Sequence, residues 1–172
     1  MKKLLIVLFL VVLALPVCGQ RDVMGYGKFD LELGFENPIA AAHIPGMTNH
    51  ITFPFLYIEG RWQLENQPID VGFRFGYSPV QRNDGGKYYY KALPLMAVAD
   101  WQFGRGKKVN PYVGLGAGVS MNSVGYNGYA SPDFAVLPRV GVRFFRFMNL
   151  SASYLLTRKE YSRLYANLGF YF

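Results

Sequence analysis

Cysteine and histidine are almost absent from this chain of 172 residues, and both shortages limit what it can do. The single cysteine is Cys18, which excludes a disulfide framework within the chain. The two histidines, His43 and His50, form no spacing typical of a metal site. Acidic residues are also few, with 11 Asp and Glu against 18 Lys and Arg, for a net charge of +7. The basic residues form no dense cluster, so we expect anionic lipid head groups rather than nucleic acid as partners.

Long apolar runs are missing as well, except at the start of the sequence. Lys2 and Lys3 precede a short apolar run, and Gly19 offers a small residue at its end. This order is typical of a secretory signal peptide, so we predict cleavage of residues 1–19 and a single domain over residues 20–172. Two alternatives stay open. The run could anchor the chain, although a spanning helix needs about 20 apolar residues, or Cys18 could carry a lipid.

The sequence has strict alternation in place of long runs. In its last segment, polar or small residues alternate with an apolar set made of Leu164, Ala166, Leu168, Phe170 and Phe172. A period of two predicts a strand with different surroundings on its two faces. Eight such segments occur, at residues 27–35, 51–64, 69–77, 88–103, 109–121, 134–144, 150–156 and 163–172. Because several suit a tilted membrane strand of about 9–11 residues, we predict an all-β fold, an antiparallel up-and-down transmembrane barrel.

The connections between these segments also alternate in length. Short turns are predicted at residues 65–68, 104–108 and 146–149, and longer loops at residues 36–50, 78–87 and 122–133. Short periplasmic turns and long outer loops are usual in outer-membrane barrels. This orientation places Trp62 and Trp101 near the periplasmic interface, where tryptophan commonly anchors a membrane protein.

The final segment, which ends on aromatic Phe172, resembles the assembly signal that the insertion machinery reads in bacterial outer-membrane barrels. Residues 110–119, NPYVGLGAGV, are similar to the glycine-rich strand of small outer-membrane barrel domains in Bacteroidota-like bacteria. The chain as a whole resembles the eight-stranded OmpA/OmpX/OmpW type. The resemblance implies a Gram-negative outer-membrane location and the barrel assembly machinery as a partner during insertion. It names an architecture rather than an activity.

Charged residues recur at the inward positions of the predicted strands. They comprise Asp30, Glu32, Glu59, Arg61, Asp70, Arg74, Asp100, Arg139 and Arg143. An eight-stranded barrel has an interior about wide enough for side chains alone. An unpaired buried charge is costly, so we expect these groups to pair across the lumen and close it. The alternative is a narrow polar pore, with a small cavity beside the inward glycines of residues 109–121.

Prolines and outer basic residues suggest further roles. Pro54, Pro94 and Pro138 fall inside predicted strands, where each should mark a bulge or a missing hydrogen bond. The alternative is a lateral opening through which a small apolar molecule passes. Basic residues predicted near the outer rim could bind lipopolysaccharide phosphates, namely Arg82, Lys87, Lys91, Arg158, Lys159 and Arg163.

Enzymatic activity is not expected. Some outer-membrane barrels modify lipid A with a catalytic histidine. The most similar set of residues in this chain is His43 or His50 with Ser78 and Asp84, and its spacing matches that of those enzymes poorly. No cofactor or metal is expected. We therefore predict a monomeric outer-membrane barrel with a charge-filled lumen and a structural or surface-interaction role. A porin-like channel or lateral-gate transporter is the first alternative, and a lipid A-modifying enzyme is the weaker one.

Overall fold

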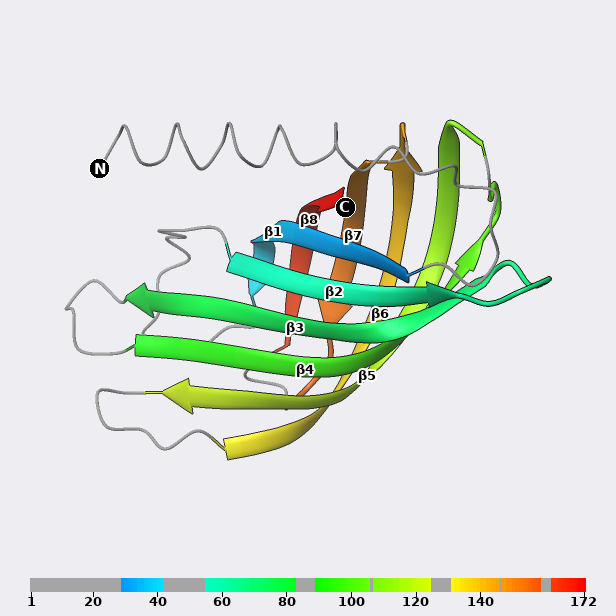
Figure 1. Cartoon of the computed structure of the whole chain (residues 1–172). Helices are drawn as coiled ribbons and strands as arrows, with labels where there is room; N and C mark the ends of the chain where they lie inside the picture. Colours follow the sequence, from blue (N-terminus) through cyan, green and yellow to red (C-terminus); the bar gives the residue numbers. More distant parts are fainter. Residues whose placement is uncertain are drawn as a thin grey trace.

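Eight antiparallel strands form a closed barrel in which each strand pairs with its neighbours in the sequence (Figure 1). The computed structural model describes residues 29–41, 55–82, 89–105, 107–124, 131–145, 147–158 and 162–172. The barrel closes where β8 pairs with β1, for example at Phe35 and Leu168. The strands are β1 (Phe29–Ala41), β2 (Phe55–Gln63), β3 (Ile69–Arg82), β4 (Tyr89–Gln102), β5 (Val109–Val124), β6 (Ser131–Phe144), β7 (Met148–Leu155) and β8 (Arg163–Tyr171).

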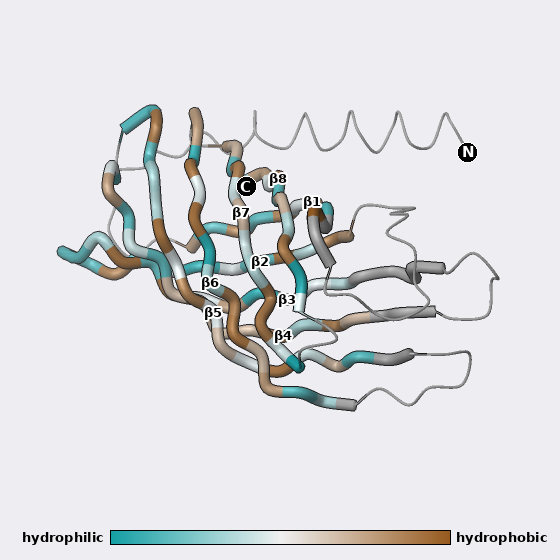
Figure 2. Tube along the Cα trace, turned by 180° about the vertical axis from the view of Figure 1, so that it is seen from behind, coloured by the Kyte–Doolittle hydropathy of each residue, from teal (hydrophilic) through white to brown (hydrophobic). Residues whose placement is uncertain are grey.

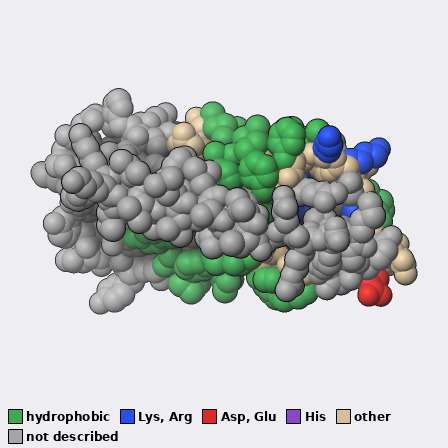
Figure 3. All heavy atoms as spheres, turned by 45° about the horizontal axis from the view of Figure 1, so that its top comes forward, with side chains coloured by type: hydrophobic (Ala, Val, Ile, Leu, Met, Phe, Trp, Pro, Cys, Tyr) green, Lys and Arg blue, Asp and Glu red, His purple; other side chains and the backbone are tan. Residues whose placement is uncertain are grey.

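The wall is apolar outside and polar inside, the reverse of a soluble protein. In β2, Leu56, Ile58 and Trp62 are exposed, whereas Glu59 and Arg61 are buried. The same alternation follows the other strands (Figure 2), and hydrophobic side chains cover much of the described surface (Figure 3). So large an exposed apolar surface is typical of a barrel that spans a membrane. No helix in the described residues is long and apolar enough to cross a membrane.

The strands extend further than the alternation predicts at the end of the barrel opposite the short turns. β1 continues to Ala41 and β3 to Arg82, although residues 36–50 and 78–87 were predicted as loops. Glu36 remains in β1 because it pairs with Phe55 of β2 and Asn167 of β8. Pairing with two neighbours, rather than local sequence, decides where a barrel strand ends.

Prolines interrupt the ladder at Pro94 and Pro138, and the two register shifts lie beside two other prolines, Pro38 and Pro79. The β3–β4 pairs pass from Phe75–Leu95 to Ser78–Ala92 without a change of register and without a pair at Pro94. The β6–β7 ladder reaches Arg139–Ser153, passes over Pro138, and resumes at the bridge from Val136 to Leu156. Both prolines therefore mark missing pairs, as predicted. The shifts fall between Pro38 and Ala40 and between Ser78 and Gln81, and Pro54 lies outside the described residues.

Candidate functional site

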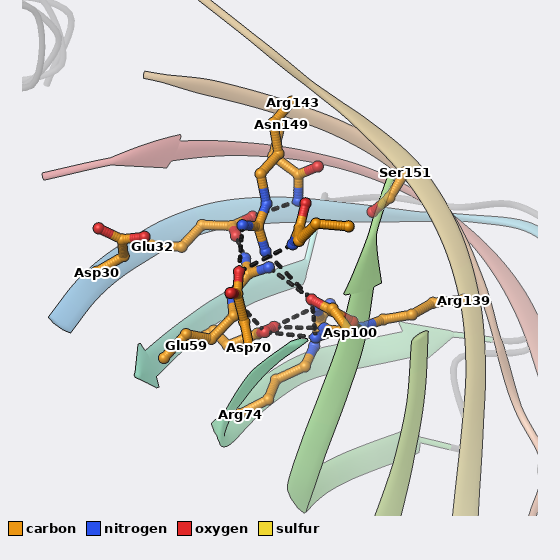
Figure 4. A network of polar contacts seen from close by, with 12 residues as sticks. Asp30, Glu32, Glu59, Asp70, Arg74, Asp100, Arg139, Arg143, Asn149 and Ser151 are labelled. Atoms are coloured by element: carbon orange, nitrogen blue, oxygen red, sulfur yellow. Dashed lines mark hydrogen bonds and ion pairs between the residues drawn. The ribbon is translucent and has the colours of Figure 1, made fainter. Parts of the chain in front are cut away.

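The lumen is filled by a layer of buried charged side chains. Five strands project them inward, because inward positions alternate with outward ones along each strand. Figure 4 shows most of them converging from opposite sides of the barrel. The layer consists of Glu32, Glu36, Glu59, Arg61, Asp70, Arg74, Asp100, Arg139 and Arg143. We call this set the ionic layer.

Arg139 of β6 joins two carboxylates from the opposite wall. Its Nη1 lies 2.7 Å from Glu59 Oε2, and its Nε lies 2.8 Å from Asp100 Oδ1. Its Nη2 donates to both carboxylates, at 2.7 Å to Glu59 Oε1 and 2.8 Å to Asp100 Oδ2. Guanidinium donors arranged in a fork suit this double carboxylate contact. Arg139 thus links β6 to β2 and β4 across the lumen.

Arg61 of β2 forms a second centre of the ionic layer. Its Nε lies 2.9 Å from Glu59 Oε1, and its Nη1 lies 2.8 Å from Asp100 Oδ2. It also pairs with Glu32 of β1 and donates to the Tyr171 hydroxyl of β8 at 2.8 Å. These contacts tie the first and last strands to the centre of the lumen, next to the seam that closes the barrel.

The end of the barrel near the short turns is closed by Asp70. Its carboxylate accepts from Arg143 Nη1 at 2.6 Å and from Gln102 Nε2 at 2.9 Å. Arg105, in the β4–β5 turn, also binds Asp70 and donates to the Leu64 carbonyl of the β2–β3 turn at 3.0 Å. A cation from one turn therefore joins the neighbouring turn at the rim of the barrel.

The outer side of the ionic layer is bounded by Arg74. It pairs with Glu36 and with Glu59, the latter at 3.1 Å, and its guanidinium carbon lies 3.8 Å from the centre of the Tyr57 ring. A stacked guanidinium gains a cation–π contact in addition to its ion pairs. The Tyr57 hydroxyl in turn donates to Glu32, so an aromatic ring links the outer and inner parts of the layer.

Inward glycines provide room for the large side chains opposite them. A methyl group on Gly141 would lie 2.6 Å from a Tyr112 ring carbon and 2.6 Å from Ser151 Cβ. A methyl group on Gly114 would overlap Asp100 and lie 3.0 Å from Arg139 Nε. The predicted cavity beside the inward glycines of residues 109–121 is therefore wrong at Gly114, where charged side chains occupy the space.

An apolar layer covers the ionic layer on the side of the predicted outer loops. It brings together side chains from β2, β4, β6, β7 and β8, each at most 4% exposed: Phe55, Met96, Val98, Ala135, Leu137, Leu155 and Tyr165. Phe55 and Tyr165 meet edge to face, with ring centres 5.8 Å apart. The lumen is thus filled by two layers with different chemistry, one ionic and one apolar.

The predicted lumen residues meet, with one exception. Asp30 lies at the edge of the barrel, where it accepts from Gln63 Nε2 at 2.8 Å instead of joining an arginine. Two residues that pair with the lumen charges were not predicted to do so. Glu36 was assigned to a loop, and Arg105 to a turn, since neither local pattern shows what the residue faces. Four residues of the predicted assembly signal share the outward face of β8, where Leu168 is exposed, and Phe172 directly follows the strand.

The residues predicted to contact lipopolysaccharide lie in different parts of the structure. Arg158 is 69% exposed and binds Asp133 at 2.8 Å. Arg163 is 1% exposed, so its assignment to the exposed outer rim is wrong. It lies on the inward side of β8. Arg82 lies in β3 rather than in the loop predicted at residues 78–87, and Lys91 lies in β4, within a predicted strand. Lys87 and Lys159 lie outside the described residues.

The residues weighed for catalysis do not form a described site. Ser78 belongs to β3, while His43, His50 and Asp84 lie outside the described residues. Within the described ranges, no group of three or more His, Cys, Asp or Glu side chains could hold a metal ion. The absence of enzymatic activity stays a prediction.

Comparison with solved structures shows the same barrel. No protein-family model and no curated protein matches this sequence. The outer-membrane protein Ail of Yersinia pestis, in a phospholipid bilayer nanodisc, is similar with a TM-score of 0.53 and 14% identity, over 85% of this chain and 99% of Ail. Neisserial surface protein A is similar with a TM-score of 0.51 and 14% identity, over 83% of this chain and 92% of that protein. The chain therefore has the fold of small outer-membrane β-barrels.

Proposed function

We propose that this chain is an integral protein of the bacterial outer membrane whose lumen is closed, and that it acts as a structural element or through contacts made by its outer loops. The apolar outward face supports the membrane location, because it would be unfavourable in water. The predicted signal peptide and the fold shared with outer-membrane proteins support it further.

The observation that carries the proposal is the pairing of Arg139 with Glu59 and Asp100 across the lumen, at 2.7 and 2.8 Å. All three side chains are at most 1% exposed. Breaking such a buried pair leaves an uncompensated charge at a cost of about 3–5 kcal/mol. A path for ions or solutes would have to open this layer and the apolar layer beside it, so a channel is the weaker alternative.

A lateral opening is also disfavoured by the wall around Pro138. Val136 and Leu156 exchange two backbone hydrogen bonds of 2.8 Å on one side of the proline, and the Arg139–Ser153 pair lies on the other. Only a short interruption separates these two connections. Arg158 further joins the β7–β8 connection to Asp133 of β6. We therefore propose that Pro138 interrupts the ladder without gating it.

The proposed outer-membrane location suggests the partners of this protein. We propose lipopolysaccharide at the outer rim, with Arg158 among the contacts and Arg82, Lys87, Lys91 and Lys159 as further candidates. The barrel assembly machinery would bind the outward residues of β8 during insertion. The protein is proposed to be a monomer without a cofactor.

Insertion and closure can be tested together in lipid vesicles. The protein should refold into phospholipid vesicles and show a heat-dependent shift in gel mobility. Vesicles that contain it should then swell in an isosmotic sugar solution no faster than empty vesicles. Swelling at the rate given by a general porin would contradict the closed lumen. A folded protein that stays in the aqueous phase would instead contradict the membrane location.

A further inference from the structure

An exposed aromatic and basic patch lies where the β4–β5 and β6–β7 turns meet. Phe103 and Phe145 are each 61% exposed and Phe147 is 40% exposed. Lys107 and Lys108 are exposed beside them. We call these five residues the turn patch. Figure 3 shows Lys and Arg side chains next to hydrophobic ones at the upper edge of one end of the molecule, and acidic side chains at the lower edge of the same end.

The two turns hold the turn patch in one arrangement. The Phe145 amide donates to the Lys108 carbonyl at 2.9 Å, and the Phe147 amide donates to the Phe144 carbonyl at 3.2 Å. The Phe145 and Phe147 rings are stacked, with centres 6.3 Å apart. Phe145 has a φ of 50°, in the left-handed region, which is costly for a bulky residue. Core packing does not explain this conformation, because the ring is mostly exposed.

The charged side chains in the sequence of the two turns have one sign. Between Asp100 and Asp133 the sequence has no Asp or Glu, and between Asp133 and Glu160 it again has none. The neighbouring β2–β3 turn differs, since it carries the exposed Glu65. Arg105 is directed away from the patch, toward Asp70. The two lysines are therefore free of nearby acidic residues along their own turn and complement an anion.

The turn patch is continuous with the apolar outer wall. Trp101, on the outward face of β4, lies two residues before Phe103 and is 48% exposed. Aromatic rings next to cations suit the boundary between lipid head groups and acyl chains. We propose that the turn patch binds an anionic phospholipid, with Lys107 and Lys108 on its phosphate and the three phenyl rings against its glycerol and upper acyl region. This inference rests on the proposed membrane location.

The two tryptophans of the chain allow a matched test. Trp101 lies on the strand that leads to the turn patch, and Trp62 is comparably exposed, at 45%, next to the acidic β2–β3 turn. The full chain is refolded into phosphatidylcholine vesicles that contain brominated phosphatidylglycerol or, as control, brominated phosphatidylcholine. Trp62→Phe leaves Trp101 as the reporter, and Trp101→Phe leaves Trp62. Heat-shifted gel mobility confirms folding of each variant.

Brominated phosphatidylglycerol should quench Trp101 more strongly than brominated phosphatidylcholine does. The relative binding constant should favour the anionic lipid by about fivefold for each lysine that contacts the phosphate. Trp62 should show no such preference. Lys107→Gln with Lys108→Gln, in the Trp62→Phe background, should abolish the preference at Trp101.

Three results would overturn the proposal. Equal quenching of Trp101 by both lipids would do so and would leave the patch to a protein partner. A preference that survives the double lysine substitution would assign the effect to other groups. Absence of quenching of either tryptophan by either lipid would overturn both this inference and the proposed membrane location.

Discussion

The guanidinium of Arg139 shows how a charge can be kept inside this barrel. It binds two carboxylates in a site that is 1% exposed, so its donors replace the water that they lose. The identity of these residues follows from the sequence alternation. Their partners do not, because the distance across the lumen depends on how eight strands close.

Removing this arginine should be far more damaging than removing an exposed one. Arg139→Ala leaves Glu59 and Asp100 short of a partner, and we expect a loss of about 3–5 kcal/mol of unfolding free energy. Arg158→Gln, at a 69% exposed side chain, should cost about 0–1 kcal/mol. Urea unfolding in vesicles measures both. The combination Glu59→Gln with Arg139→Gln should recover part of the loss, and equal effects of Arg139→Ala and Arg158→Gln would contradict the role of the ionic layer.

The close approach of the Tyr112 ring to Gly141 gives a second prediction. Gly141→Ala would place Cβ 2.6 Å from Tyr112 and from Ser151, so the ring must shift. We expect a loss of about 1–3 kcal/mol of unfolding free energy, as for other overpacked sites. Ala117→Val adds bulk on the outward face and should change stability by less than about 0.5 kcal/mol. A tolerated Gly141→Ala would mean that the lumen has room to spare.

Among the elements, the faces of the strands are more predictable than their ends. The alternation of apolar Phe73 and Phe75 with Arg74 places each side chain correctly, because the pleat is a local property. The end of β1 is not local: Glu36 stays in the strand through pairing on both sides. The same reason explains Arg105, whose contact with Asp70 requires two turns that are distant in sequence to meet.

Pro138 allows a test of the interrupted ladder. Val136 directs its amide toward β7, and position 138 has the same direction, so Pro138→Val should add a backbone hydrogen bond to β7. The unfolding free energy should rise by up to about 1 kcal/mol, while Val136→Pro removes the 2.8 Å bond and should lower it. The urea concentration at the midpoint of unfolding, measured for both variants, shows whether each substitution raises or lowers stability. A loss of stability in Pro138→Val would show that the gap itself is favourable.

For the molecule as a whole, two stacked layers replace the open path that a barrel could enclose. The ionic layer joins β1, β2, β3, β4 and β6, while the apolar layer draws on β2, β4, β6, β7 and β8. Both layers draw on β2, β4 and β6. The sequence predicts the ionic layer through its inward charges. It does not predict the apolar layer, because its members all lie in predicted strands but which of them meet across the lumen depends on how the barrel closes.

Conductance of the refolded protein in a planar lipid bilayer tests the closed lumen most directly. The wild-type protein, with folding confirmed by heat-shifted gel mobility, should give no discrete current steps. The matched variant combines Glu59→Ala and Arg139→Ala in the ionic layer with Met96→Ala in the apolar layer. Small current steps should appear with this variant. Reproducible steps from the wild-type protein would contradict the closed lumen and favour a porin-like channel.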